Sequence, residues 1–270
     1  MTTPDDTDLL LLDGDWGSLG VTRLGATVSS WRPRGVERLF TAGDATPALG
    51  RMWQGGIPVC APWFGQAVGQ GWAVPWSHGL VSRVRWDVAG VSNAAHEARV
   101  SLTTDAAATA HLPGADRFPL DLRYRLDIAA DDRSLTMALT VASPTADAVI
   151  DAVFHPYLAA DARGEAAEGL EGVAFHDYAT GADGVDRSPV PLAGPIDRVY
   201  AGARPVVLPG AGLRMDARGA DTVVVWNPGP GTSKVPADEW ADFACVEYGA
   251  LARPIPAGGE LRLTLTLTVR

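Results

Sequence analysis

Two ionisable side chains stand where they could carry out general acid–base chemistry. His155 directly follows the stretch 148–154, which is apolar except for Asp151, so it comes at the end of a predicted strand. Glu247 follows Phe243 and Cys245 at alternate positions, so a strand would place its carboxyl group on the face of an apolar row. Burial raises the pKa of such a carboxyl group toward neutrality, where it becomes an effective general base. The alternative, purely structural roles are a histidine hydrogen-bonded to a backbone carbonyl and a glutamate in a surface ion pair.

A run rich in glycine, proline and tryptophan, residues 55–65, departs from strand alternation, and Trp72, Trp76 and His78 follow it. The chain has nine Trp against six Phe and five Tyr, which is an unusual ratio. An indole ring covers sugar C–H bonds with its apolar face while its N–H donates a hydrogen bond. We therefore expect Trp63 and Trp72 to contact a sugar, with loop and core packing as the alternative.

Short strands joined by turns must position these groups. Alternating aliphatic residues predict half-buried strands at 122–128, 135–141 and 261–269, with Asp131 and Asp132 in a hairpin turn between the first two. Further strand candidates are 20–29, 98–103, 148–154 and 222–226, whereas the stretches near 105–115 and 162–172 resemble loops or short turns. The 30 Gly and 20 Pro are spread along the chain, and no repeat or linker divides it. We predict one all-β domain over residues 1–270, a large antiparallel β-sandwich.

Composition and charge exclude several classes of function. The chain is 47% hydrophobic and 20% charged, as expected for a protein with a packed core. Its net charge of -10 disfavours binding to nucleic acid or to an anionic membrane. The start, Met1–Leu12, lacks the basic region of a signal peptide, and no apolar run is long enough to cross a bilayer, so we expect a cytoplasmic protein. Cys60 and Cys245 are expected to be buried, reduced thiols.

Four separated motifs occur in a fixed order from about residue 50 to the C-terminus. They are residues 55–65 with His78-Gly79-Leu80 after them, Phe154-His155-Pro156-Tyr157, Asp197-Arg198-Val199-Tyr200, and Val225-Trp226-Asn227-Pro228-Gly229 leading to 243–247. Each motif is modest alone, but the ordered set is specific. It resembles the aldose 1-epimerases, and within them the branch of D-hexose-6-phosphate mutarotases.

The resemblance implies a galactose mutarotase-like β-supersandwich with a sugar bound in a cleft on one sheet. It implies that His155 is the general acid toward the ring oxygen and that Glu247 is the base for the anomeric hydroxyl. It further implies that His78 binds or assists at the substrate and that Asp197 holds sugar hydroxyls. Ring opening and reclosure by acid and base would then interconvert the α and β anomers without a cofactor or a metal.

Two positions depart from the phosphate-recognising branch. In that branch an arginine typically precedes the Gly-Gly of the first motif, and another lies four residues after the histidine that His78 matches. Here Gln54 and Ser82 stand in those places. Neither supplies the charged planar fork that an arginine offers to a phosphate. Arg51 and Arg83 lie close enough in sequence to substitute, so Gln54, Arg51 and Arg83 are all candidate substrate-binding residues. A neutral hexose and a hexose 6-phosphate both remain open, and we expect only a modest preference for the phosphate.

Two other classes of function fit parts of the pattern. A carbohydrate-binding module would share the sandwich and the aromatic platform but would not require both His155 and Glu247. A glycoside hydrolase would use two carboxylates, for which Asp197 and Glu247 are candidates, although the matched motifs do not place them so. We expect a small-molecule sugar or sugar phosphate as the partner and a monomeric chain.

Overall fold

The computed structural model describes residues 8–236 and 238–270. The strands of this part of the chain are β1 (Leu9–Gly14), β2 (Gly17–Thr22), β3 (Thr27–Pro33), β4 (Val59–Cys60), β5 (Asp87–Asn93), β6 (Ala98–Asp105), β7 (Arg123–Ala130), β8 (Ser134–Ser143), β9 (Ala148–Phe154), β10 (Tyr157–Ala159), β11 (Ala166–Ala167), β12 (Ala174–Asp177), β13 (Ala182–Val185), β14 (Val190–Pro191), β15 (Ile196–Ala201), β16 (Val206–Leu208), β17 (Leu213–Arg218), β18 (Thr222–Asn227), β19 (Phe243–Ile255) and β20 (Gly259–Val269). One short α-helix, α1 (Ala106–Thr109), and the 3-10 turns η2 (Val81–Arg83), η3 (Ala115–Arg117) and η4 (Glu239–Ala241) interrupt them. The segment assessed for a signal peptide lies partly outside the described residues, since positions 1–7 are not among them.

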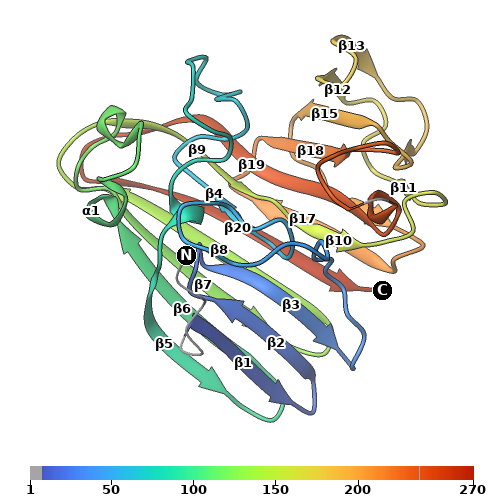
Figure 1. Cartoon of the computed structure of the whole chain (residues 1–270), viewed down its shortest axis with the longest axis horizontal. Helices are drawn as coiled ribbons and strands as arrows, with labels where there is room; N and C mark the ends of the chain where they lie inside the picture. The colour runs from blue at the N-terminus through green and yellow to red at the C-terminus, as the bar shows by residue number, and fades with distance from the viewer. Residues whose placement is uncertain (1–7, 237) are drawn as a thin grey trace.

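The strands form two large antiparallel sheets and two small ones (Figure 1). One large sheet has the order β13-β12-β15-β18-β19-β9-β4, with β10 pairing β19, and the other has the order β16-β17-β20-β8-β7-β6-β5. The small sheets are β1-β2-β3 and β11-β14. No helix among the described residues is both long enough and apolar enough to span a membrane.

The two large sheets face each other across one apolar core. Strands β7 and β8 alternate buried and less buried residues, as period-two patterning requires. Their buried side chains, such as Leu126 and Leu139, share a core cluster with Ile150 of β9 and Val246 of β19. The predicted all-β sandwich is therefore confirmed.

Strand β19 is packed on both faces, and Glu247 lies on the face that points away from the core between the large sheets. Ala244 and Val246 point into the core between the large sheets, so Cys245 and Glu247 point to the opposite face. That face is not open to solvent, since Cys245 is fully buried and Glu247 is 1% exposed. The apolar row predicted beside Glu247 thus exists, but it faces a second layer of packing rather than the interior of the sandwich.

Most of the predicted strands are present, and one boundary was wrong. The stretch 20–29 is two strands, β2 and β3, joined by a turn. Gly25 and Ala26 both have positive φ, at 72° and 49°, which no extended strand allows. A Cβ at Gly25 would lie 2.6 Å from the carbonyl oxygen of Ser82, so close backbone packing fixes the turn there.

Candidate active site

A cleft of about 600 Å³ opens on the outer face of the sheet that contains β19. Loops and strands from distant parts of the chain line it: Arg51, Met52, Gln54, Phe64, Gly65, Gln66, Val68, Ser77, His78, Arg83, His155, Tyr157, Tyr178, Asp197, Val199, Val224, Trp226, Lys234 and Glu247. Seven of the nine residues predicted to form the site are in this set. The cleft is large enough for a monosaccharide and combines apolar walls with converging polar groups.

The pair His155 and Glu247 lies buried at this cleft. Register explains their meeting: Phe154, the last residue of β9, pairs with Tyr248 of β19, His155 directly follows Phe154, and Glu247 directly precedes Tyr248. The His155 Nε2 and Glu247 Oε1 atoms are 3.4 Å apart, and the two side chains are only 5% and 2% exposed. Within residues 8–236 and 238–270, His155 Nδ1 and Glu247 Oε2 have no hydrogen-bond partner. Buried polar atoms left in this state are costly unless a bound group completes them.

Burial shifts the pKa values of the two groups in opposite directions. Loss of solvation raises the pKa of Glu247 well above 4.5, and the nearby charge of Asp197 adds to the rise. Loss of solvation lowers the pKa of His155 well below 6.5, and the neighbouring His78 lowers it further. Both shifts favour a pair that is neutral overall and holds one proton between its two members.

His78 lies beside this pair in a constrained backbone conformation. Its φ is +68°, a left-handed value that a non-glycine residue adopts at an energetic cost. The Gly65 N–H donates to His78 Nδ1 at 3.4 Å, so the ring nitrogen that carries a proton in the neutral form is Nε2. Burial, with the charges of Arg83 and Lys234, lowers the pKa of His78 to about 4. At neutral pH His78 is therefore an uncharged hydrogen-bond donor, and its ring centroid is 5.1 Å from that of His155.

A carboxylate, a cation and two aromatic rings complete the walls of the cleft. Asp197 lies on β15, and burial raises its pKa while Lys234 opposes that rise. The Lys234 Nζ atom sits 5.1 Å from the centre of the Trp226 ring. Tyr157 stacks on His155 with ring centroids 4.8 Å apart. This wall holds the imidazole of His155 in place and presents hydrogen-bonding groups around it.

The candidate phosphate-binding residues occupy different surroundings. Gln54 and Arg51 line the cleft and are exposed, and Arg51 also donates to Thr46. Arg83 lines the cleft too, but its guanidinium donates to the backbone oxygens of Gly50, Ser77 and Gly79. These bonds tie together the loops that surround His78. Ser82, in contrast, is buried and does not line the cleft.

The two tryptophans predicted to stack on a sugar are not brought to the cleft. Trp63 is fully buried, and its indole N–H donates to the Trp76 carbonyl oxygen. Trp72 packs against Trp63 with centroids 5.2 Å apart and donates to Gln70. The interior of this loop layer needs large apolar side chains, and these rings supply them.

Sequence reasoning did not select Tyr157, Tyr178, Trp226 or Lys234 as site residues. Tyr157 and Trp226 belong to the quoted motifs, so the motifs themselves carried that signal. Lys234 is the single lysine in the chain, where every other basic side chain apart from histidine is an arginine. That solitary position was a usable signal. Tyr178 gave no signal in the sequence, because only the fold places its half-exposed ring at the rim of the cleft.

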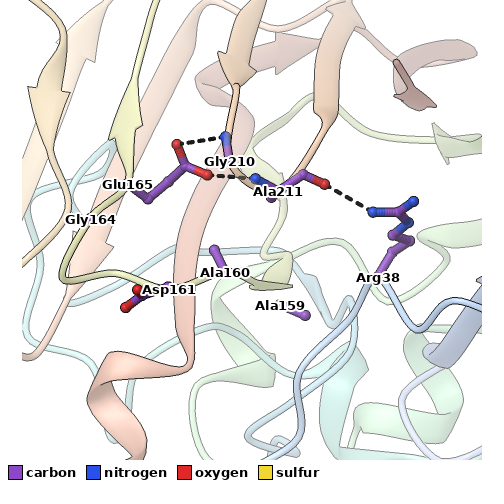
Figure 2. Close-up of a pocket in the computed structure, with 8 residues that line it drawn as sticks. All are labelled: Arg38, Ala159, Ala160, Asp161, Gly164, Glu165, Gly210 and Ala211. Carbon is purple, nitrogen blue, oxygen red and sulfur yellow. Dashed lines mark hydrogen bonds between the residues drawn. The ribbon is translucent and has the colours of Figure 1, made fainter.

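A second hollow, of about 460 Å³, lies beside β10 and contains Arg38, Asp161 and Glu165 (Figure 2). Both carboxylate oxygens of Glu165 accept backbone N–H groups, from Gly210 and Ala211 among others. Arg38 donates to the Ala211 carbonyl oxygen and points away from Asp161. The polar groups of this hollow are committed to the backbone and do not converge, so it offers no acid–base arrangement.

Comparisons with known proteins agree with the fold and the motifs. A family model described as Aldose 1-epimerase matches residues 8–267. A Salmonella typhimurium protein provisionally assigned as a glucose-6-phosphate 1-epimerase is 37% identical over 83 residues, which is 30% of this chain and 27% of that protein. The aligned part thus spans about a quarter of the relative, and an Escherichia coli protein of the same assignment matches at 36% identity over 83 residues.

Solved structures show the same architecture. The crystal structure of a provisionally assigned mutarotase from Salmonella typhimurium superposes with a TM-score of 0.82 at 22% identity, covering 98% of this chain and 92% of that one. A galactose mutarotase-like protein from Clostridium acetobutylicum gives a TM-score of 0.73 at 11% identity, with 98% and 99% coverage. The similarity in fold persists where sequence identity is low. Because the family model matches residues 8–267 of the 270 in this chain, the chain belongs to the aldose 1-epimerase family.

Proposed function

We propose that this chain is an aldose 1-epimerase that interconverts the α and β anomers of a hexose or hexose 6-phosphate. The observation that carries the proposal is the buried contact between His155 Nε2 and Glu247 Oε1 at the cleft, 3.4 Å apart, with the outer polar atom of each side chain unpartnered in the described part of the chain. A sugar hydroxyl and a ring oxygen are groups that such a pair can serve with a proton acceptor and a proton donor.

In the proposed reaction, Glu247 accepts the proton of the anomeric hydroxyl while protonated His155 donates a proton to the ring oxygen. The C1–O5 bond breaks, and the sugar opens to an aldehyde. After rotation about the C1–C2 bond, the C5 hydroxyl attacks the other face of the carbonyl. His155 takes back the hydroxyl proton and Glu247 returns its proton to the carbonyl oxygen, which regenerates the starting pair.

The pair stays neutral overall through this cycle. Before ring opening it consists of a carboxylate and an imidazolium, and after ring opening it consists of a carboxylic acid and a neutral imidazole. A buried site strongly disfavours net charge, and neither state carries any. The same burial that raises the pKa of Glu247 and lowers that of His155 shifts the balance between the two proton distributions toward the carboxylic acid and the neutral imidazole.

His78, Asp197 and Gln54 are proposed to orient the sugar. Neutral His78 offers an Nε2–H donor beside the acid, and Asp197 offers an acceptor for sugar hydroxyls across the cleft. Trp226 and Tyr178 supply apolar surface for the ring C–H bonds. The buried His155–Glu247 pair favours this function over a carbohydrate-binding module, which needs no proton transfer, and over a hydrolase, which would pair two carboxylates.

The test measures the rate of anomer exchange by NMR, in one-dimensional time courses and exchange spectra. The purified protein is added to freshly dissolved α-D-glucose, α-D-galactose or α-D-glucose 6-phosphate. The proposal expects a protein-dependent increase in the rate of anomer exchange for at least one sugar. Binding of these sugars with no increase in exchange for any of them would show a sugar-binding protein instead.

An anionic group on the substrate is proposed to lie near Lys234 and Arg51, the exposed cations of the cleft. We expect Lys234→Met to raise KM for glucose 6-phosphate about fivefold, the effect of one exposed ion pair worth about 1 kcal/mol, and to leave KM for glucose unchanged. Arg163→Met is the matched control, because Arg163 covers the Trp240 ring at 5.1 Å and does not line the cleft. If Lys234→Met changed KM equally for both sugars, the phosphate would not lie near Lys234.

A further inference from the structure

Asp151 is a fully buried carboxylate that the proposed chemistry does not use. It lies on β9, four residues before His155, and period-two alternation places Asp151, Val153 and His155 on one face of the sheet. Val153 packs there with Phe64 and Val224, which line the cleft or lie beside its floor. Asp151 is therefore behind the site, on the same surface as the proposed acid.

Both oxygens of Asp151 accept backbone N–H groups from two different segments. Phe64 N donates to Oδ2 at 2.9 Å, and Ala252 N donates to Oδ1 at 2.8 Å. The Asp151 backbone N–H also donates to the Pro62 carbonyl oxygen at 2.8 Å. The residue thus joins the loop that begins at Pro62 to the bulge in β19 near Ala252.

The surroundings leave no freedom for this carboxylate. A Cβ added at Gly69 would lie 2.3 Å from Asp151 Oδ1 and 2.8 Å from Ala252 N. Gln70 Nε2 donates to the Pro62 carbonyl oxygen at 2.6 Å, which closes the loop over the same point. A glycine at 69 is thus what allows the loop to pass close to the carboxylate.

The loop held by Asp151 in turn holds His78. Gly65, the residue after Phe64, donates its N–H to His78 Nδ1 and accepts the His78 backbone N–H through its carbonyl oxygen. The Phe64 ring lies 5.2 Å from the His78 ring, and the His78 ring lies 5.1 Å from that of His155. A continuous set of contacts therefore runs from the Asp151 carboxylate through residues 64 and 65 to His78 at the cleft.

We propose that Asp151 is a positioning residue of the active site, which fixes the backbone at Phe64 and Gly65 and thereby sets the orientation and tautomer of His78. The expected change in kcat rests on the proposed epimerase function. The expected change in the orientation and tautomer of His78 does not depend on that function. Replacing one carboxylate oxygen by an amide NH2 group sets two donors against each other at either Phe64 N or Ala252 N, so the loop must shift.

The experiment compares Asp151→Asn with Asp221→Asn. Asp221 is the matched control, since its carboxylate accepts Leu251 N and the Thr222 hydroxyl beside the same bulge of β19 and is hydrogen-bonded to none of residues 62–65. We expect Asp151→Asn to lower kcat roughly tenfold to a hundredfold through misplacement of His78, with a smaller change in KM, while Asp221→Asn retains kcat. Both variants are expected to lose some thermal stability.

The second readout is the ¹⁵N NMR spectrum of the His78 ring, assigned by its loss in His78→Gln. In the wild-type protein Nε2 is expected to be protonated and Nδ1 to be unprotonated, and Asp151→Asn is expected to shift this signal pair while Asp221→Asn does not. An unchanged His78 signal and an unchanged kcat in Asp151→Asn would overturn the inference. A wild-type protein that is inactive on every hexose would overturn the proposed function instead, and the NMR readout would still decide the role of Asp151.

Gly69→Ala provides a second route if Asp151→Asn does not fold. It retains the carboxylate and displaces it, because the added methyl group approaches Asp151 Oδ1 to 2.3 Å. The same shift of the His78 signal is expected, and its absence in a folded Gly69→Ala protein counts against the proposal.

Discussion

At the scale of single residues, the chemistry depends on how burial treats net charge. The doubly protonated His155–Glu247 pair carries a charge of +1, the fully deprotonated pair carries -1, and the singly protonated pair is neutral. Burial lowers the pKa of His155 and raises that of Glu247, so within the neutral pair it shifts the proton from the imidazole toward the carboxyl group. The singly protonated pair is also the form that the proposed reaction uses.

The single proton shared by His155 and Glu247 sets the expected pH dependence of kcat. For isolated groups the singly protonated pair would dominate only between the ordinary pKa values of 4.5 and 6.5. In the protein we expect kcat to fall on the acidic side as the pair takes up a second proton and on the alkaline side as the pair loses its only proton. Anomer exchange rates measured from pH 4 to 9 at constant ionic strength test it. A rate that rises or falls steadily across this whole range would contradict it.

At the scale of elements, the site is built where segment 55–80, whose strand β4 pairs with β9, lies beside the junction of β9 and β19. Within this segment, Gly79 packs directly against the backbone of Ala61. Its φ is +72°, and a Cβ there would lie 2.1 Å from the carbonyl oxygen of Ala61, with which Gly79 forms a parallel bridge. Since the contact is with backbone, it cannot be relieved by rotating a side chain.

Gly79→Ala is therefore expected to lower the free energy of unfolding by more than about 2 kcal/mol, and Tm by roughly 5 °C or more. Gly71→Ala is the control, because Gly71 has a similar φ of +67° but nothing within 4 Å of an added Cβ. We expect it to cost only the backbone strain, about 1 kcal/mol. Thermal unfolding followed by circular dichroism compares the two, and equal losses would show that backbone strain alone acts at Gly79.

The elements also show what sequence could and could not reveal. Alternation located the strand at 261–269, which lies within β20, because a half-buried strand repeats every two residues. It failed at 20–29, because a turn through Gly25 and Ala26 leaves no mark on hydrophobic period. Motif positions identified His155 and Glu247, whereas the direction of Trp63 and Trp72 depends on loop packing that no local pattern encodes. Lys234 reaches the cleft from a loop 13 residues before Glu247, and only the fold brings the two together.

At the scale of the whole molecule, the expected single domain has a direct signature. Seven of the nine tryptophans lie within the first 86 residues, whereas strands extend to Val269. Tryptophan fluorescence therefore reports mainly on the N-terminal third, and far-UV circular dichroism reports on the whole chain. If the described strands unfold as one unit, the two probes give the same urea midpoint. Separate midpoints would show two independently stable parts.

The central claim is that a buried glutamate, Glu247, takes a proton from the anomeric hydroxyl, and the substitution Glu247→Gln tests it most directly. Glutamine keeps the shape of the side chain but cannot accept that proton, so anomer exchange is expected to fall by about a hundredfold or more. Glu165→Gln, at a buried carboxylate of the other hollow, is expected to retain wild-type exchange in the same assay. Undiminished exchange by a folded Glu247→Gln protein would contradict the account.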